Sequence, residues 1–474
     1  MRRTVTPLID AIKEYCEVAK FRGHTPGHRG GNTVSKDLLD INLFEWDITE
    51  IEGVGNLFVE NGPIYQSEMI TSEIYDSQRT LFFTQGSTSA IQTAFLAVRS
   101  LSKKILVPRN AHVSVINAII ISGLEPIWYS AKINSQGLYL PFDADKILLM
   151  LDKHSDIQLV FIQSPTYEGS VGELEKLSEK CKDRGVLLIV DEAHGAHLIL
   201  SEKLPISACE VKSDIVIQSP HKTLPALTGS AYLHIYNKKL INKCLEARKI
   251  IHSTSPSFLS LASLDSLNSY LKENGKDLYQ KLKIISDQIC KAVLDRKNCE
   301  LAYTSENNDF TKIPIFFKAN RQKVSNILME YGIIIEKWSG SVALILLTPE
   351  ITKDEYNLII QALDKIDELE KELTCKTEFF TEKLPKVNMS AREAYFSEAE
   401  LIKIEEASGR ICARTIMIIP PGIPLLIPGE EISLDLTNTI KKLSSEDILS
   451  GIVVKDTEVF ISVVKKITLK ECLL

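Results

Sequence analysis

The sequence has no CxxC pair, although its 474 residues include nine cysteines scattered from Cys16 to Cys472. Closely paired cysteines would indicate a zinc knuckle or a redox motif, and an odd, dispersed set gives no disulfide framework. Scattered thiols are typical of a reducing compartment, where they serve as small buried side chains. We therefore predict neither a structural zinc site nor disulfide bonds.

A membrane-spanning hydrophobic run, an apolar signal-peptide core, internal repeats and low-complexity segments are also missing. Polar Asp10, Lys13 and Glu14 follow the first residues directly, so we expect a cytoplasmic protein without a membrane partner. The net charge of −7 provides no positive surface excess for nucleic acid. With 44% hydrophobic and 25% charged residues, the chain has the composition of a soluble protein of two or three domains.

Short β-rich runs alternate with amphipathic stretches between about residues 80 and 240. The expected strands are 80–84, 104–107, 159–162, 186–190, 214–217 and 230–235, and the helix-like segments between them include 89–101, 112–122 and 174–184. Such alternation requires crossover connections, so it predicts an α/β fold with a mainly parallel sheet covered on both faces.

This alternation fades after about residue 240, which suggests further domains. A helical region at 259–296 precedes a mixed segment with strand-like 312–317 and 342–347, then a charged linker at 371–387, and finally a predicted helix at 393–408 with a Pro/Gly-rich loop and short strands. We expect an N-terminal segment (1–70), a large domain (71–300), a small α/β domain (301–387) and a C-terminal domain (388–474).

Two loops that follow expected strands carry groups suited to a phosphorylated, planar ligand. Gly86, Ser87 and Thr88 open a helix, where free amides and hydroxyls can bind phosphate. The alternative is an ordinary Ser/Thr helix cap, and the Lys of a P-loop is missing. His112 at the next turn can stack on a planar ring or simply cap its helix.

A third loop places Asp191 at the end of an apolar strand, followed by Ala193, His194 and His197. A buried aspartate needs a cationic partner, and a protonated pyridine nitrogen would serve. A metal site is the competing interpretation, because one aspartate and two histidines lie within seven residues.

The fourth loop, Ser219-Pro220-His221-Lys222, also follows a strand. A lysine projecting into a site there can have its pKa lowered by desolvation and become a nucleophile, whereas an ordinary lysine is a solvated surface charge. The order of hydroxyl-rich loop, histidine, aspartate and lysine is what a pyridoxal-phosphate site requires.

With these motifs the chain resembles the Orn/Lys/Arg decarboxylase family of fold-type-I pyridoxal-phosphate enzymes, in a short form without the N-terminal wing domain. The resemblance covers nearly the whole chain and is carried by the segments 24–28, 47–50, 108–112, 164–167, 190–197, 219–223, 420–424 and 428–430. It implies a fold-type-I large domain with smaller α+β C-terminal domains, pyridoxal 5'-phosphate as cofactor, and a homodimer or higher homo-oligomer with shared active sites.

The resemblance also implies residue roles. Lys222 would bind the cofactor aldehyde, Asp191 would pair with the ring nitrogen, and His221 or Lys222 would return a proton to the substrate. The remaining implied cofactor contacts are Gly86, Ser87, Thr88, His112, Ala193, His194, Ser219, His221 and Thr254, the last toward the neighbouring subunit. Candidate substrate residues are His24, His28, Glu50, Glu168 and Glu430, and no metal is implied.

Three departures from the family pattern bear on specificity or rate: Gly55-Asn56-Leu57-Phe58, Val113 and Glu168. The expected reaction is decarboxylation of a basic amino acid, with arginine favoured and lysine or ornithine as alternatives. An aminotransferase on the same fold is one rival, but no arginine lies between Arg321 and Arg392 to hold a substrate carboxylate. A catalytically silent cofactor-binding protein is the other.

Overall fold

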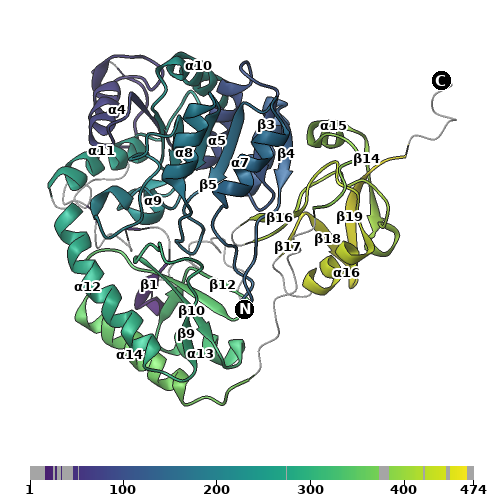
Figure 1. The fold of residues 1–474 in the computed structure, drawn as a ribbon. Coiled ribbons are helices and arrows are strands. Elements are labelled where there is room, and N and C mark those ends of the chain that lie inside the picture. Colours follow the sequence, from purple (N-terminus) through teal and green to yellow (C-terminus); the bar gives the residue numbers. More distant parts are fainter. Residues whose placement is uncertain are drawn as a thin grey trace, which may run out of the picture.

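The computed structural model describes residues 17–24, 27–28, 34, 46–51, 53–273, 275–372, 384–419, 422–444 and 449–466. Figure 1 shows a large sheet domain, a smaller domain that contains α12–α14, and a separate yellow C-terminal module. None of the helices in these ranges is long and apolar enough to cross a membrane.

A seven-stranded sheet forms the centre of the large domain, in the order β2-β8-β7-β6-β5-β3-β4. The strands are β2 (Arg79–Phe83), β8 (Ala231–Ile235), β7 (Ile215–Gln218), β6 (Leu187–Asp191), β5 (Leu159–Gln163), β3 (Lys104–Pro108) and β4 (Glu125–Tyr129). Pairing is parallel from β7 to β4 and antiparallel for β8 and β2. The predicted mainly parallel sheet is thus confirmed. β4 was not predicted, because it is a partly exposed edge strand that contains Pro126.

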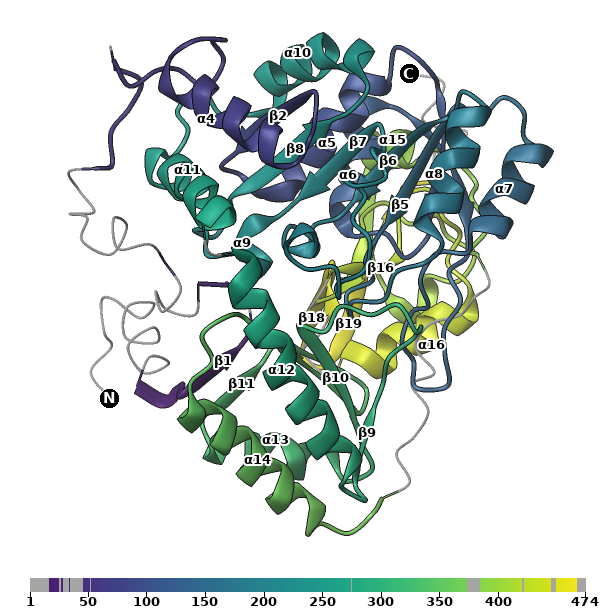
Figure 2. The ribbon, with the colours of Figure 1, turned by 60° about the vertical axis from the view of Figure 1, so that its left-hand side comes forward.

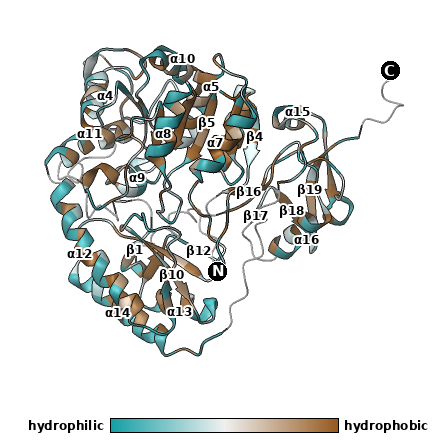
Figure 3. Ribbon diagram, in the orientation of Figure 1, coloured by the Kyte–Doolittle hydropathy of each residue, from teal (hydrophilic) through white to brown (hydrophobic). Residues whose placement is uncertain are grey.

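Alternating side chains of the strands supply two separate cores. On β5, Leu159 and Phe161 belong to the core shared with α5 (Gly86–Val98), α6 (Val113–Ser122) and α10 (Ile241–Ile251). Val160 and Ile162 belong to the core on the opposite face, with α7 (Ala144–Lys153) and α8 (Leu174–Asp183). In Figure 3 the central strands are brown, between helices that turn teal faces outward. This period-two alternation positions the sheet and its loops rigidly.

The small domain is built on the antiparallel sheet β12-β13-β10-β9. Its strands are β9 (Cys299–Leu301), β10 (Lys312–Phe317), β12 (Lys337–Ser339) and β13 (Val342–Leu346), covered by α13 (Arg321–Glu330) and α14 (Lys353–Asp367). A short N-terminal strand, β1 (Phe21–Gly23), pairs in parallel with β11 (Ile333–Ile335) of this domain. Figure 2 shows the purple β1 lying beside the green β11, so part of the N-terminal segment packs against the small domain.

Two expected domain boundaries, at residues 70 and 300, fall inside secondary-structure elements. Residue 70 lies within α4 (Gly62–Ile74), which packs on β2 and on α11 (Phe258–Glu273) of the large domain. Residue 300 lies within β9, and α12 (Gly275–Leu294) before it packs on α14. The remaining division stays a prediction, and most of the expected linker, residues 373–383, lies outside the described residues.

The C-terminal module contains two three-stranded sheets, β14-β19-β18 and β16-β15-β17. Their strands are β14 (Ala399–Lys403), β15 (Ile416–Ile418), β16 (Ile423–Leu426), β17 (Leu449–Ser450), β18 (Ile452–Lys455) and β19 (Glu458–Val464), beside α16 (Leu434–Leu443) and a core of their own. The predicted helix at 393–408 is wrong beyond residue 396. α15 (Ala391–Phe396) starts at a Ser390 capping box and ends at Ser397, and 399–403 then form β14, which pairs with β19.

Candidate active site

A cavity of about 320 Å³ lies at the carboxyl ends of the parallel strands, where ligands bind in open α/β sheets. The large domain contributes residues from the loops after β3, β5, β6 and β7, the small domain contributes Lys337, and the C-terminal module contributes Ile419 and Ile423. Of the residues predicted from the sequence, Ser87, His112, Glu168, Asp191, Ala193, His194 and Lys222 line this cavity.

Asp191 and Lys222 both line this cavity, and each influences the pKa of the other. Asp191 ends β6 and is buried, and one of its oxygens accepts a hydrogen bond of 3.1 Å from the Ala193 amide. Burial raises the pKa of this carboxyl, and the Lys222 ammonium partly offsets the rise. Desolvation also lowers the pKa of Lys222, against the attraction of Asp191 and Glu336. The pair therefore combines a buried carboxylate with an amine that gives up its proton more readily than a surface lysine.

His194 and Tyr167 pack around the Lys222 amine. Lys222 Nζ lies 3.1 Å from His194 Nε2, and burial next to Lys222 holds the pKa of His194 well below its usual value. The rings of His194 and Tyr167 are 4.4 Å apart. The neutral imidazole of His194 can thus form a hydrogen bond with the amine, and Tyr167 restricts the orientation of the imidazole ring.

Three charged residues of the small domain converge on Tyr167, and the sequence reasoning missed all three. Lys312 Nζ donates to the Tyr167 carbonyl at 3.1 Å, the Tyr167 hydroxyl donates to Glu336, and Lys337 Nζ lies 4.3 Å from the ring centroid. Glu336 and Lys337 directly follow the run Ile333–Ile335. Charged side chains next to such an apolar strand were the available signal for a buried site.

Glu168 is neutralised within the cavity wall. Its carboxylate lies 2.6 Å from Lys337 Nζ, and both side chains are nearly inaccessible, at 5% and 6% exposure. A buried ion pair of this geometry is net neutral, so neither partner acts as an isolated charge toward a ligand. Glu168, one of the family departures, is therefore linked to a small-domain lysine.

The first turn of α5 and the loop after β7 provide the donors that a phosphate requires. Gly86 has a φ of +75°, and the preceding Gln85 makes no side-chain capping bond to α5. Ser219 Oγ is buried and has no hydrogen-bond partner among the described residues. A buried hydroxyl without a partner is costly, and a bound phosphate oxygen would satisfy it. These residues fit the phosphate of the expected cofactor, and Thr88 lies in the same helical turn.

His112 is held between its own helix and the C-terminal module. It is the N-cap of α6, and its Nδ1 accepts from the Ser114 amide at 3.2 Å. The Val113 amide donates to the Gly422 carbonyl at 3.0 Å, and a Cβ on Gly422 would lie 3.0 Å from His112 Nε2. Gly422 also has a φ of +104°, so only glycine fits there without strain.

Nine predicted residues do not line the cavity: Gly86, Thr88 and Ser219 of the two loops described above, and six others. His221 Nδ1 bonds the Ser230 carbonyl at 2.7 Å, and burial lowers the pKa of His221 to about 4, so the structure gives no support to its predicted role as proton donor. Glu430 is bound by Arg109, and Glu50 accepts from Thr49. The others are His24, His28 and the exposed Thr254.

Structural contacts surround His28 and the segment 55–58, which departs from the family pattern. Next to His28, the Gly27 amide donates to the His221 carbonyl at 2.9 Å. Leu57 is in the core, and Phe58 packs on His252. Pro420 and Pro421 of the family motif lie outside the described residues.

The metal interpretation of Asp191, His194 and His197 gains no support. His197 Nε2 lies 3.0 Å from Asp309 Oδ2, both fully buried, and the ring stacks on Tyr279. Within the described ranges, no cluster of three or more His, Cys, Asp or Glu side chains is arranged to hold a metal ion. His197 is thus engaged by Asp309 and Tyr279.

Comparisons with known proteins agree with this geometry. The model of the Orn/Lys/Arg decarboxylase major domain matches residues 6–324, and that of the C-terminal domain matches 373–445. The chain is 30% identical to an arginine decarboxylase of Bacillus anthracis over 92% of both chains, and 29% identical to one of Halalkalibacterium halodurans over 91% of this chain and 92% of that one. The structure matches lysine decarboxylase A of Pseudomonas aeruginosa with a TM-score of 0.79, at 20% identity, over 97% of this chain and 80% of that one. The predicted fold and the predicted class of enzyme, an amino-acid decarboxylase, are thereby confirmed, and the chain belongs to the Orn/Lys/Arg decarboxylase family.

Proposed function

We propose that this chain binds pyridoxal 5'-phosphate through Lys222 and decarboxylates arginine to agmatine. The observation that carries the proposal is the joint placement of Asp191 and Lys222 in one cavity, beside the uncapped first turn of α5. The arginine decarboxylases among the relatives are 29–30% identical to the chain, whereas a lysine decarboxylase of Pseudomonas aeruginosa is 22% identical. That difference supports arginine over lysine.

When bound, pyridoxal phosphate supplies an electron sink for the bond between Cα and the leaving carboxylate. Asp191 would hold a proton on the ring nitrogen, because a buried carboxylate is stabilised by a neighbouring cation. Gly86, Ser87, Thr88 and Ser219 would hold the phosphate, and His112 would cover the ring.

Lys222 is the group best placed to move protons at the reacting carbon. Its lowered pKa favours a neutral Nζ that can accept a proton and return it after carbon dioxide leaves. His194, 3.1 Å away, would orient this amine through its neutral ring. His221 is not proposed for this step, because its Nδ1 bonds the Ser230 carbonyl.

The wall of the cavity favours loss of the substrate carboxylate over its retention. Lys337 is the small-domain cation there, but Glu168 neutralises it. A tight grip on the carboxylate would stabilise the ground state, so a compensated cation suits a decarboxylase better than an aminotransferase. Because Glu168 cancels the charge of Lys337, a cationic group can approach this part of the wall, and we propose that the distal cation of the substrate lies near this pair and Asp143, the third cavity carboxylate.

The test compares wild-type protein with Lys222→Ala, with Lys249→Ala as a matched control on the surface of α10. Each protein is incubated with pyridoxal phosphate and with arginine, lysine or ornithine, and amine, carbon dioxide and keto acid are measured. We expect agmatine from wild type and control, and loss of both turnover and visible cofactor absorbance in Lys222→Ala. Keto acid would indicate an aminotransferase, and cofactor binding without any product would indicate a silent binding protein.

We also propose a cytoplasmic homodimer in which Thr254 reaches the neighbouring site. Its support is the exposure of Thr254 and of the preceding Ile250, which is 73% exposed at the end of α10. Light scattering on purified protein should give twice the chain mass, and a monomer that turns over arginine would contradict the proposal.

A further inference from the structure

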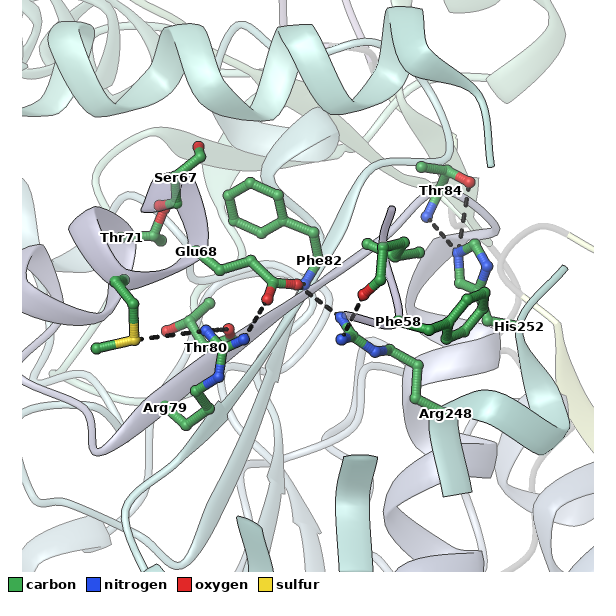
Figure 4. Close-up of polar contacts among 12 residues, drawn as sticks. Phe58, Ser67, Glu68, Thr71, Arg79, Thr80, Phe82, Thr84, Arg248 and His252 are labelled. Carbon is green, nitrogen blue, oxygen red and sulfur yellow. Dashed lines mark hydrogen bonds and ion pairs between the residues drawn. The ribbon is translucent and has the colours of Figure 1, made fainter. Parts of the chain in front are cut away.

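A cluster of buried charged side chains is centred on Glu68 of α4. It contacts β2, the strand that leads to residues 85–88, which we call the phosphate loop because they are proposed to bind the cofactor phosphate. Glu68 Oε1 accepts from Arg248 Nη1 at 2.6 Å and from the Phe82 amide at 2.8 Å, and Oε2 accepts from Arg79 Nη2 at 2.5 Å. Figure 4 shows the Glu68 carboxylate between these two arginines. Glu68 and Arg248 are almost completely buried. The cluster therefore fixes α4, β2 and α10 to one another.

Arg248 also fixes the residues before α4. Its Nη2 donates to the Leu57 carbonyl at 2.8 Å, and its guanidinium lies 6.0 Å from the Phe58 ring. The ring of Phe58 in turn meets His252 edge-on at 6.2 Å. The segment that departs from the family pattern thus packs on the last turn of α10.

His252 follows that turn, four residues after Arg248, and contacts the chain just before the phosphate loop. The Thr84 amide donates to His252 Nε2 at 3.1 Å, so Nε2 is the unprotonated nitrogen. Nδ1 must then carry the proton and donate to the Ser253 carbonyl at 2.9 Å. Burial lowers the pKa of His252, which keeps this ring neutral. Figure 4 shows His252 beside Thr84.

A second hydrogen bond links the same two segments. The Ser253 amide donates to Gln85 Oε1 at 3.1 Å. Thr84 and Gln85 connect β2 to Gly86, where the first turn of α5 begins. Residues at the end of α10 therefore hold both Thr84 and Gln85, the two residues that lead into α5.

We infer that His252 is a positioning residue for the cofactor phosphate: through Thr84 it holds the 85–88 loop, and the Glu68–Arg248 pair holds His252. The inference rests on the proposed function, because it assumes that this loop receives the phosphate of pyridoxal phosphate. His252 does not line the cavity, so its effect on the cofactor is through the loop.

The test measures binding of two cofactor forms to the full chain. Pyridoxal phosphate needs the loop, whereas pyridoxal, which has no phosphate, does not. His252→Leu keeps the volume but removes the acceptor, so we expect a roughly tenfold higher dissociation constant for pyridoxal phosphate and no change for pyridoxal. His252→Gln restores an acceptor oxygen and should recover most of the affinity. Hydrogen exchange at the Thr84 amide should be faster in His252→Leu only.

His154→Leu is the matched control, since His154 is exposed at the end of α7 and should change neither constant. If His252→Leu does not fold, Gln85→Ala breaks the second link at an exposed residue and should give the same selective loss. Equal effects on both ligands, or none, would overturn the inference. Equal dissociation constants of the wild-type protein for pyridoxal and pyridoxal phosphate would also overturn the inference. A wild-type protein that binds neither ligand would refute the proposed function itself.

Discussion

Replacing Glu430 with glutamine should loosen the C-terminal module from the large domain. The Glu430 carboxylate receives Arg109 Nε at 2.8 Å and Nη2 at 2.8 Å, and the Ile427 amide at 2.9 Å. Arg109 follows β3, so this two-pronged pair joins the loop before His112 to the module that carries Gly422. Glu430 is 1% exposed and the Arg109 side chain 10%.

The magnitude follows from what the substitution leaves behind. Removing one charge of a buried ion pair costs about 3–5 kcal/mol, because the other charge stays buried without compensation. Arg109 keeps two carbonyl acceptors, Pro424 at 2.9 Å and Leu425 at 3.2 Å, and glutamine keeps one oxygen. We therefore expect the lower end, about 3 kcal/mol. The neighbouring Glu431→Gln removes a solvent-screened pair with Lys386 and should change the stability little.

Urea unfolding of both variants would measure the difference. Trp128 is a local reporter, because its ring lies 6.0 Å from the Arg109 guanidinium. In Glu430→Gln the fluorescence transition should shift to lower urea, and turnover should fall because Gly422 no longer supports His112. If Glu430→Gln shifts the transition no more than Glu431→Gln, the module is not held by this pair and the reasoning is refuted.

Two further predictions concern the small-domain charges. Burial lowers the pKa of Lys312 from 10.5 to about 8, so the unfolded chain binds more protons between these values and stability should rise with pH there, by about 3 kcal/mol. The stability difference between wild type and Lys312→Met should change by that amount between pH 8 and 10.5 in urea titrations, and a constant difference would contradict it. Glu168→Gln leaves the Lys337 charge uncompensated near a cationic substrate, so the KM for arginine should rise about tenfold. The exposed Glu173→Gln is its control, and an unchanged KM in Glu168→Gln would show that the Lys337 charge does not act on the substrate cation.

The residues that we propose to bind the cofactor could be picked out from the sequence because each of them lies in a local pattern. Asp191 and Lys222 both follow apolar strand runs, and parallel strands bring such positions to one edge of the sheet. The strand runs themselves were recognisable because Leu159–Gln163 and Leu187–Asp191 are buried on both faces and read as continuous apolar segments. Local pattern misled where a helical spacing at 393–408 competed with long-range pairing, since β14 gains its hydrogen bonds from β19, some sixty residues away.

The rest of the site depends on contacts that no local pattern encodes. Lys337 meets Glu168, and Glu430 meets Arg109, although the partners of each pair are far apart in the sequence. Each carboxylate, considered alone, was a reasonable candidate for binding a substrate cation. A buried carboxylate is available to a ligand only if no resident cation already neutralises it, and only the folded structure identifies that cation. By this criterion both Glu430 and Glu168 are neutralised, but they differ in place. Glu430 is paired with Arg109 away from the cavity, whereas the Glu168–Lys337 pair lies in the cavity wall. For that reason the choice among basic substrates is expected to depend on how the small domain positions Lys337, and less on the cofactor motifs that identify the family.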